Sequence, residues 1–204
     1  MKYVSADEAV KLVKSGDWVF FQGSTAVPVI IQEALARRAD ELRGVNIVSG
    51  FNITKGPAPF CKPEYKDSFF VNSLFLCADQ RQYVAEGYGS LIPGFLGELP
   101  SLIRRHEIPI DVACINCSFP DENGYCSYNI SADLAQPAVE AAKIVIAQVN
   151  KSIPYLYGTA MIHESQITAA IECDDPPVDM QFGPPTEIES AIGSYIAAEI
   201  PDGA

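Results

Sequence analysis

The sequence predicts an α/β fold, with an open and mostly parallel sheet flanked by helices, from three observations. Short apolar runs that are typical of buried strands occur at residues 18–21, 45–48, 111–117 and 144–149. Segments with the helical spacing of apolar residues lie between these runs, as in residues 29–42. The run at 111–117 is almost continuously apolar, which is typical of a central parallel strand covered on both faces. Strands that alternate with helices in this way indicate a parallel sheet.

The composition is that of a globular protein, with 204 residues of which 48% are hydrophobic and 20% are charged. This length is sufficient for one large domain with a substantial core. The formal net charge is -12, which argues against non-specific nucleic-acid binding, because phosphate groups must be neutralised by Lys and Arg.

The sequence favours a cytoplasmic location. No apolar run approaches the roughly 18–20 residues that a membrane span requires. The first residues are typical of an acidic helix start and not of a secretory signal. We therefore expect a cytoplasmic protein whose six cysteines are reduced and buried.

Local signals predict the remaining elements. Ser5 and Glu8 form a capping box that starts a helix, and Gly44 ends the helix at 29–42. Residues 51–66 hold three prolines and are expected to form a long loop. The other expected strands are residues 69–75, 90–93 and 168–172, the other expected helices are residues 5–14, 77–86, 96–105, 134–142 and 187–198, and further loops are expected at 118–127 and 174–185.

The loop after the first strand is the first candidate ligand site, because ligands bind at the carboxyl edge of open α/β sheets. It contains Gln22, Gly23, Ser24 and Thr25. Ser24 or Thr25 is expected to cap the following helix, whose free backbone N–H groups carry the positive end of the helix dipole. Gly23 permits a close backbone approach that a side chain would block. The same pattern also fits an ordinary strand–turn–helix junction.

A second candidate loop follows the apolar run at 111–117. It contains Ser118 and Asp121, and Asp121 is suited to closing an Asx-turn. A structured turn without a ligand is the alternative interpretation. Because two such loops after two core strands lie at the same edge of a parallel sheet, together they indicate a ligand cleft.

Metal or thiol-redox chemistry is not favoured. Cys114 and Cys117 form a Cys-x-x-Cys motif, but in a strand residues three apart point to opposite faces. His106 follows two arginines at an expected helix end, and His163 is expected to make a structural hydrogen bond. The sequence also lacks the Gly-x-Ser-x-Gly elbow, the phosphate loop of nucleoside triphosphatases and the Gly-x-Gly-x-x-Gly fingerprint of nicotinamide cofactors.

Several motifs, which occur in order along the whole chain, resemble those of a known family. The most specific is the loop from Ser118 to Ser127. The others are Ser5–Val10, Gly16-Asp17, Gly23-Ser24 with Pro28, Glu33–Leu35, Tyr88–Pro93 through Glu98–Pro100, and Ala141–Asn150. This set resembles the start of the acetyl-CoA hydrolase/transferase family, and most closely its 4-hydroxybutyrate and butyryl-CoA:acetate CoA-transferases.

The resemblance implies that residues 1–204 form the N-terminal one of two similar α/β domains, with the fold of CoA-transferases. The catalytic residue of the family is a glutamate in the C-terminal domain, which forms a glutamyl-CoA intermediate. That glutamate is not in this sequence, so no catalytic residue is assigned, and Glu98 and Glu122 are expected to be structural or surface groups. The resemblance implies no metal and no cofactor beyond the CoA of the substrate.

The resemblance also implies the substrate-binding residues and the partners. Gln22, Gly23, Ser24 and Thr25 are expected to bind a carboxylate or an oxyanion, and Ser118 and Asp121 to shape the opposite side of the pocket. The expected partners are acyl-CoA, small carboxylates, the C-terminal domain and further copies of the protein. No nucleic acid and no membrane is expected.

Three functions remain open at this point. The first is CoA transfer between short-chain acyl-CoA and carboxylates, the second is acyl-CoA hydrolysis on the same scaffold, and the third is an isolated, non-catalytic domain. The chain stops at Ala204, just after a well-formed helix, so we expect a domain cut from a longer protein or one piece of a nicked one. An exposed apolar patch is expected where the second domain docks.

Overall fold

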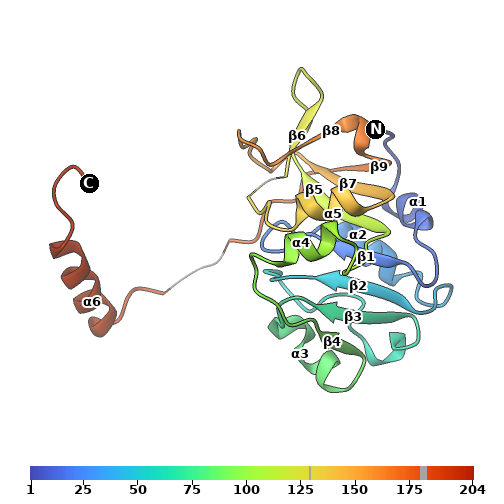
Figure 1. Ribbon diagram of the computed structural model, residues 1–204, viewed down its shortest axis with the longest axis horizontal. Coiled ribbons are helices and arrows are strands. Elements are labelled where there is room, and N and C mark those ends of the chain that lie inside the picture. Colours follow the sequence, from blue (N-terminus) through green and yellow to red (C-terminus); the bar gives the residue numbers. More distant parts are fainter. Residues whose placement is uncertain (129, 180–182) are drawn as a thin grey trace.

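The computed structural model describes residues 1–128, 130–179 and 183–204, and its centre is a seven-stranded sheet (Figure 1). The strand order is β4-β3-β2-β1-β5-β7-β9, and every neighbouring pair is parallel. A second, two-stranded antiparallel sheet pairs β6 with β8. The strands are β1 (Trp18–Phe21), β2 (Val45–Ser49), β3 (Phe69–Ser73), β4 (Gly89–Leu91), β5 (Val112–Cys117), β6 (Tyr125–Ser127), β7 (Ile144–Asn150), β8 (Met161–His163) and β9 (Ala169–Cys173).

The chain changes direction across the sheet at β1. From β1 it runs outward through β2 and β3 to β4, and it then returns to β5 on the other side of β1 and continues outward through β7 to β9. The point between β1 and β5 is therefore a topological switch point, where two loops leave adjacent strands in opposite directions. The predicted α/β architecture is confirmed.

Helices cover both faces of the sheet and create two cores. One core packs residues of α1, α2 and α3 against the sheet, and the other packs residues of α4, α5 and the small sheet against the opposite face. Cys114 belongs to the first core and Cys117 to the second, as the strand period predicts. The α-helices are α1 (Ala6–Ala9), α2 (Val29–Ala36), α3 (Ala78–Ala85), α4 (Leu99–Arg104), α5 (Ala135–Ala141) and α6 (Glu187–Ala198), and three short 3₁₀-helices span Val10–Leu12, Pro63–Tyr65 and Glu164–Gln166.

Helix α2 ends at Ala36, so the predicted extension to residue 42 is wrong. Beyond Ala36 the backbone tightens, because Arg38 N–H donates to Leu35 O and Ala39 N–H donates to Ala36 O. These bonds span three residues instead of four, which is typical of a frayed helix end. The predicted helix at 5–14 is similarly divided into α1 and a 3₁₀ turn at Val10–Leu12.

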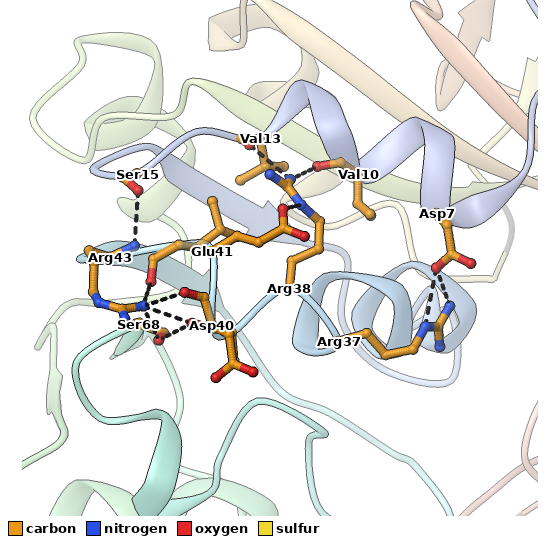
Figure 2. Close-up of polar contacts among 12 residues, drawn as sticks. Asp7, Val10, Val13, Ser15, Arg37, Arg38, Asp40, Glu41, Arg43 and Ser68 are labelled. Carbon is orange, nitrogen blue, oxygen red and sulfur yellow. Dashed lines mark hydrogen bonds and ion pairs between the residues drawn. The ribbon is translucent and has the colours of Figure 1, made fainter.

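Arginine side chains stabilise this frayed segment, as Figure 2 shows. The Arg38 guanidinium donates to the carbonyl oxygens of Val10 and Val13, and it pairs with Glu41 at 3.0 Å. Arg43 donates to the carbonyl oxygens of Ala39 and Leu42. These guanidinium groups thus connect the segment after α2 to the 3₁₀ turn at Val10–Leu12 and to its own carbonyl oxygens.

The small sheet was not predicted. Its strands are three residues each and are paired by the register Tyr125↔His163, Cys126↔Ile162 and Ser127↔Met161. It lies inside the predicted loop at 118–127, and its second strand falls in a segment for which no strand was expected. Three-residue strands carry almost no periodic signal, and pairing across this distance in the chain is not a local property.

Helix α6 lies apart from the sheet domain (Figure 1). Every described residue from 183 to 204 is exposed. The predicted loop at 174–185 joins the helix to β9, and its residues 180–182 lie outside the described part of the chain. Across the described residues, no helix has both the length and the apolar character needed to cross a membrane.

Substituting a core residue of the central strand tests this architecture. Ile115 is fully buried in β5, so Ile115→Ala should lower the free energy of unfolding by about 2–5 kcal/mol through lost burial and a residual cavity. Urea denaturation followed by circular dichroism measures this change. Ile188→Ala, on the exposed face of α6, is the control and should change the value by less than about 0.5 kcal/mol. Equal effects of the two substitutions would contradict the description of the core.

Candidate functional site

A pocket of about 550 Å³ lies at the carboxyl edge of the sheet. Its walls come from the loops after β1, β2 and β3, from the chain before and at the start of α4, and from the segment before α5. Its size is in the range of small-molecule binding sites. The lining residues that the argument uses are Ser24, Phe51, Phe75, Phe95, Ser131 and Asp133.

A second pocket, of about 580 Å³, shares a wall with the first. The wall is the pair Phe51 and Phe75, whose rings meet edge to face with centroids 5.3 Å apart. Both pockets are mostly apolar, but Lys55 and Arg81 line the second, whereas Asp133 is the charged residue that lines the first. The aromatic pair therefore separates a pocket with two cationic residues from a pocket with one acidic residue.

Gln22 lies at the switch point between β1 and β5, and its side chain is completely buried. Its amide nitrogen donates to Tyr128 O at 2.7 Å and to Ser131 O at 2.6 Å. Its amide oxygen accepts from Asn116 N at 2.7 Å. Both amide hydrogens are thus used within the protein, and the side chain holds the segment that brings Ser131 to the pocket.

Gly23 and Ser24 bring the loop after β1 close to the loop after β2. A Cβ atom on Gly23 would lie 2.7 Å from Phe51 O, so only glycine fits at this position. Ser24 has a φ of 57°, its N–H donates to Phe51 O, and its carbonyl accepts from Ile53 N. A non-glycine residue in this left-handed region is uncommon and marks stored strain. The strained backbone places Ser24 at the rim of the pocket.

The start of α2 differs from the prediction. Pro28 occupies the cap position and no side chain caps the helix locally, so the expected caps Ser24 and Thr25 were wrong. Instead, Gln148 in β7 accepts from Ile30 N at 3.3 Å. The N–H groups of the first turn are bonded within the protein, which also contradicts the expected free N–H groups at this helix start. Thr25 is half-buried in the preceding turn.

Ser118 and Asp121 organise the small sheet and do not line the pocket that contains Ser24. Ser118 Oγ accepts from Ser127 N at 2.9 Å, and Asp121 accepts from Tyr125 N at 2.9 Å and from the Tyr155 hydroxyl at 2.8 Å. Phe21 is in register with Cys114, so β5 carries Ser118 about 13 Å further along the strand direction. The two candidate loops therefore leave the same edge of the sheet, but the loop after β5 begins further along the strand direction than the loop after β1.

These contacts lower the pKa of Asp121. The largest cause is the hydrogen bond from Tyr125 N, and the Tyr155 hydroxyl, Asn123 N and the nearby His163 add to it against a smaller opposing effect of desolvation. The ionised carboxylate is therefore the form that fits the turn at residues 121–125. The hydrogen bond from Asn123 N to the Asp121 carboxylate closes the Asx-turn that the sequence predicted.

The two histidines have structural surroundings. His163 Nδ1 lies 2.7 Å from Ser165 Oγ, and its ring meets Tyr125 edge to face. His106 follows α4 with a φ of 57° and donates its N–H to Ile103 O. Within residues 1–128, 130–179 and 183–204, no three His, Cys, Asp or Glu side chains gather as a metal site would require.

Most of the pocket was not found from the sequence. Phe51 and Phe75 lie two residues after the ends of β2 and β3, and Phe95 lies four residues before α4. The sequence analysis placed Phe51 in a loop and Phe75 at a strand end, and it gave Phe95 no role. A Phe directly after Gly50 or Gly94 is the signal that was available in the sequence, because a large apolar side chain next to a turn residue often lies at a binding surface.

Replacing Gln22 tests whether its role is structural. Gln22→Leu keeps the volume but leaves Tyr128 O, Ser131 O and Asn116 N without partners, so the free energy of unfolding should fall by roughly 3 kcal/mol or more. Urea denaturation is the measurement. Gln82→Leu is the matched control, since Gln82 makes an exposed bond to Glu86 and its loss should cost under about 0.5 kcal/mol. An unchanged midpoint for Gln22→Leu would refute the structural role.

The low pKa of Asp121 predicts a pH-dependent contribution to stability. A carboxyl group whose pKa is lowered on folding stabilises the protein above its ordinary pKa of about 3.9, and this contribution disappears as the pH falls through the folded-state pKa. Thermal unfolding of the protein and of Asp121→Asn should therefore differ near pH 7 and converge as the pH falls from about 5 to about 2. A difference that stays constant over this range would show that ionisation of Asp121 plays no part.

Comparison with known proteins agrees with the resemblance drawn from the motifs. The 4-hydroxybutyrate coenzyme A transferase of Clostridium kluyveri is 36% identical over 203 residues, which are 100% of this chain and 47% of that protein. The butyryl-CoA:acetate CoA-transferase of Anaerostipes caccae is 32% identical, over 100% of this chain and 46% of its own length. The crystal structure of RipA from Yersinia pestis superposes with a TM-score of 0.90 at 25% identity, over 100% of this chain and 49% of RipA.

The chain thus spans about half the length of the curated relatives that it matches. A family model matches residues 1–180, which is most of the chain. The chain belongs to the acetyl-CoA hydrolase/transferase family, and the model that matches residues 1–180 is that of the family's N-terminal domain.

Proposed function

We propose that this chain is the N-terminal half of a CoA-transferase that moves CoA between short-chain acyl-CoA and carboxylates. The names of the relatives support this reaction class, with 4-hydroxybutyrate, butyrate and acetate as the candidate acids. The nucleophilic glutamate belongs to the C-terminal half in this proposal, and its glutamyl-CoA intermediate divides the transfer into easier steps. CoA takes part as a substrate, and neither a metal nor an organic cofactor is required.

The observation that carries the proposal is the apolar pocket at the carboxyl edge with Ser24 at its rim. In it, the short acyl chain packs between Phe75, Phe95 and the apolar floor, where each buried CH₂ contributes about 0.8 kcal/mol. Ser24 is the polar group that contacts the carboxylate or the developing oxyanion. Among the described residues the Ser24 hydroxyl has no hydrogen-bond partner, so it is available to a ligand.

In this proposal the other predicted substrate-binding residues act indirectly, by supporting the pocket around Ser24 or the small sheet of β6 and β8. Gln22 positions the pocket wall, because both of its amide hydrogens are already bonded. Gly23 permits the close approach of the two loops, and Thr25 completes the turn. Ser118 and Asp121 hold the small sheet, which extends the same edge beyond the pocket.

The proposal also includes the setting of the whole protein. The partners are acyl-CoA, small carboxylates and a C-terminal domain, and the complete enzyme is a cytoplasmic homo-oligomer. No contact with nucleic acid is proposed, since a chain with a net charge of -12 has too few Lys and Arg in excess to neutralise a nucleic-acid backbone.

A transfer assay tests the proposal. The chain is co-expressed with the C-terminal half of the Clostridium kluyveri relative, and formation of butyryl-CoA from acetyl-CoA and butyrate is followed by mass spectrometry. Transfer should require both halves, and Ser24→Ala should lower kcat/KM by roughly tenfold or more, as for the loss of one polar transition-state contact. Ser101→Ala, on the exposed side of α4, is the control and should leave kcat/KM unchanged.

Two outcomes would contradict this proposal. Transfer by the 204-residue chain alone would mean that the nucleophile is in this half. Release of free CoA at the same rate without butyrate would identify a hydrolase, in which water replaces the acceptor carboxylate.

A further inference from the structure

Helix α6 presents an apolar stripe that no described part of the chain covers. Ile188, Ile192, Tyr195 and Ile196 recur at the spacing of one helix face, and Ile188 and Tyr195 are 74% and 75% exposed. A contiguous stripe of large apolar side chains is typical of an interaction surface rather than of a solvated helix.

The helix is well started but short. Thr186 and Glu189 form a complete capping box, in which each side chain bonds the backbone N–H of the other. Twelve residues are nevertheless marginal for an isolated helix in water, where packing of an apolar face supplies most helical stability. The capping residues and the stripe therefore indicate a helix made to pack against another body.

Two findings identify that body. The N-terminal domain of the family matches residues 1–180, so α6 lies beyond it. The whole chain, α6 included, superposes on 49% of the RipA chain with a TM-score of 0.90. Because the whole chain, α6 included, aligns with a chain about twice as long, the remaining half of such a chain is the candidate for the body that covers the stripe.

The charged residues around the stripe indicate the charge that a complementary partner surface should carry. Residues 183–204 contain Glu187, Glu189, Glu199 and Asp202 and neither Lys nor Arg. We propose that α6 belongs structurally to the C-terminal half of the protein, and that its stripe docks in an apolar groove of that half rimmed by Lys or Arg. The proline-rich segment 174–186 then joins the two halves. This proposal rests on family membership and does not depend on the proposed activity.

Matched pairs of substitutions test the docking. The chain is co-expressed with the C-terminal half of the Clostridium kluyveri relative, and the mass of the purified material is measured by light scattering during size exclusion. Ile192→Asp with Ile196→Asp places two charges in the stripe and should abolish the complex. Ser190→Asp with Ser194→Asp adds the same charge to the polar side of the helix and should leave at least half of the complex. Failure of the unaltered chain to form a complex, or equal behaviour of the two double variants, overturns the proposal.

Two alternative partners for the stripe, the chain's own sheet domain and a second copy of the chain, are tested on the chain alone. If α6 packed against its own sheet domain, Ile192→Asp with Ile196→Asp would lower the urea midpoint of unfolding, whereas we expect no shift. If the stripe bound a second copy, the unaltered chain would have a dimer mass that the same double variant reduced to a monomer. Either result overturns the docking of α6 on the C-terminal half. Because these readouts are mass and stability, they are independent of whether CoA transfer is observed.

Discussion

The buried amide of Gln22 is the interaction on which the candidate site depends. It joins β1 to β5 through Asn116 N and holds the chain at Tyr128 and Ser131 through two further hydrogen bonds. Each of these backbone groups would be costly to leave unpaired in the interior. One side chain thereby fixes the switch point of the sheet and the wall of the pocket next to it. The shape of the pocket at this edge therefore depends on the buried amide of Gln22, which does not itself line the pocket.

The architecture was predictable because its signals are local. Apolar runs of four to seven residues, such as β1 and β5, coincide with their predicted positions to within one residue. The errors arose where distant contacts override local preference. Arg38 reaches carbonyls 25 and 28 residues away, and Gln148 caps a helix 118 residues before it. Neither contact has any signature in the neighbouring sequence, and the same is true of the small sheet.

The candidate site was predictable only in outline. The motifs indicated the correct edge of the sheet, because the loops after β1 and β5 do leave adjacent parallel strands. They did not show that β5 continues past β1, nor that the amide of Gln22 is fully bonded, since burial of a polar loop residue depends on what lies above it. Ser24 alone of the predicted residues lines the apolar pocket, held there by a strained backbone and by the close contact at Gly23.

The first residues of the chain cover one border of the sheet. Val4 N donates to Ala170 O and Ala170 N donates to Lys2 O, so Tyr3 forms an isolated parallel bridge with Ala170 of β9. A bare parallel edge offers unpaired N–H and C=O groups to any other chain and favours aggregation. By covering the edge of β9, the amino-terminal segment protects the protein against aggregation. An affinity tag should therefore be placed where it does not disturb the pairing of these residues.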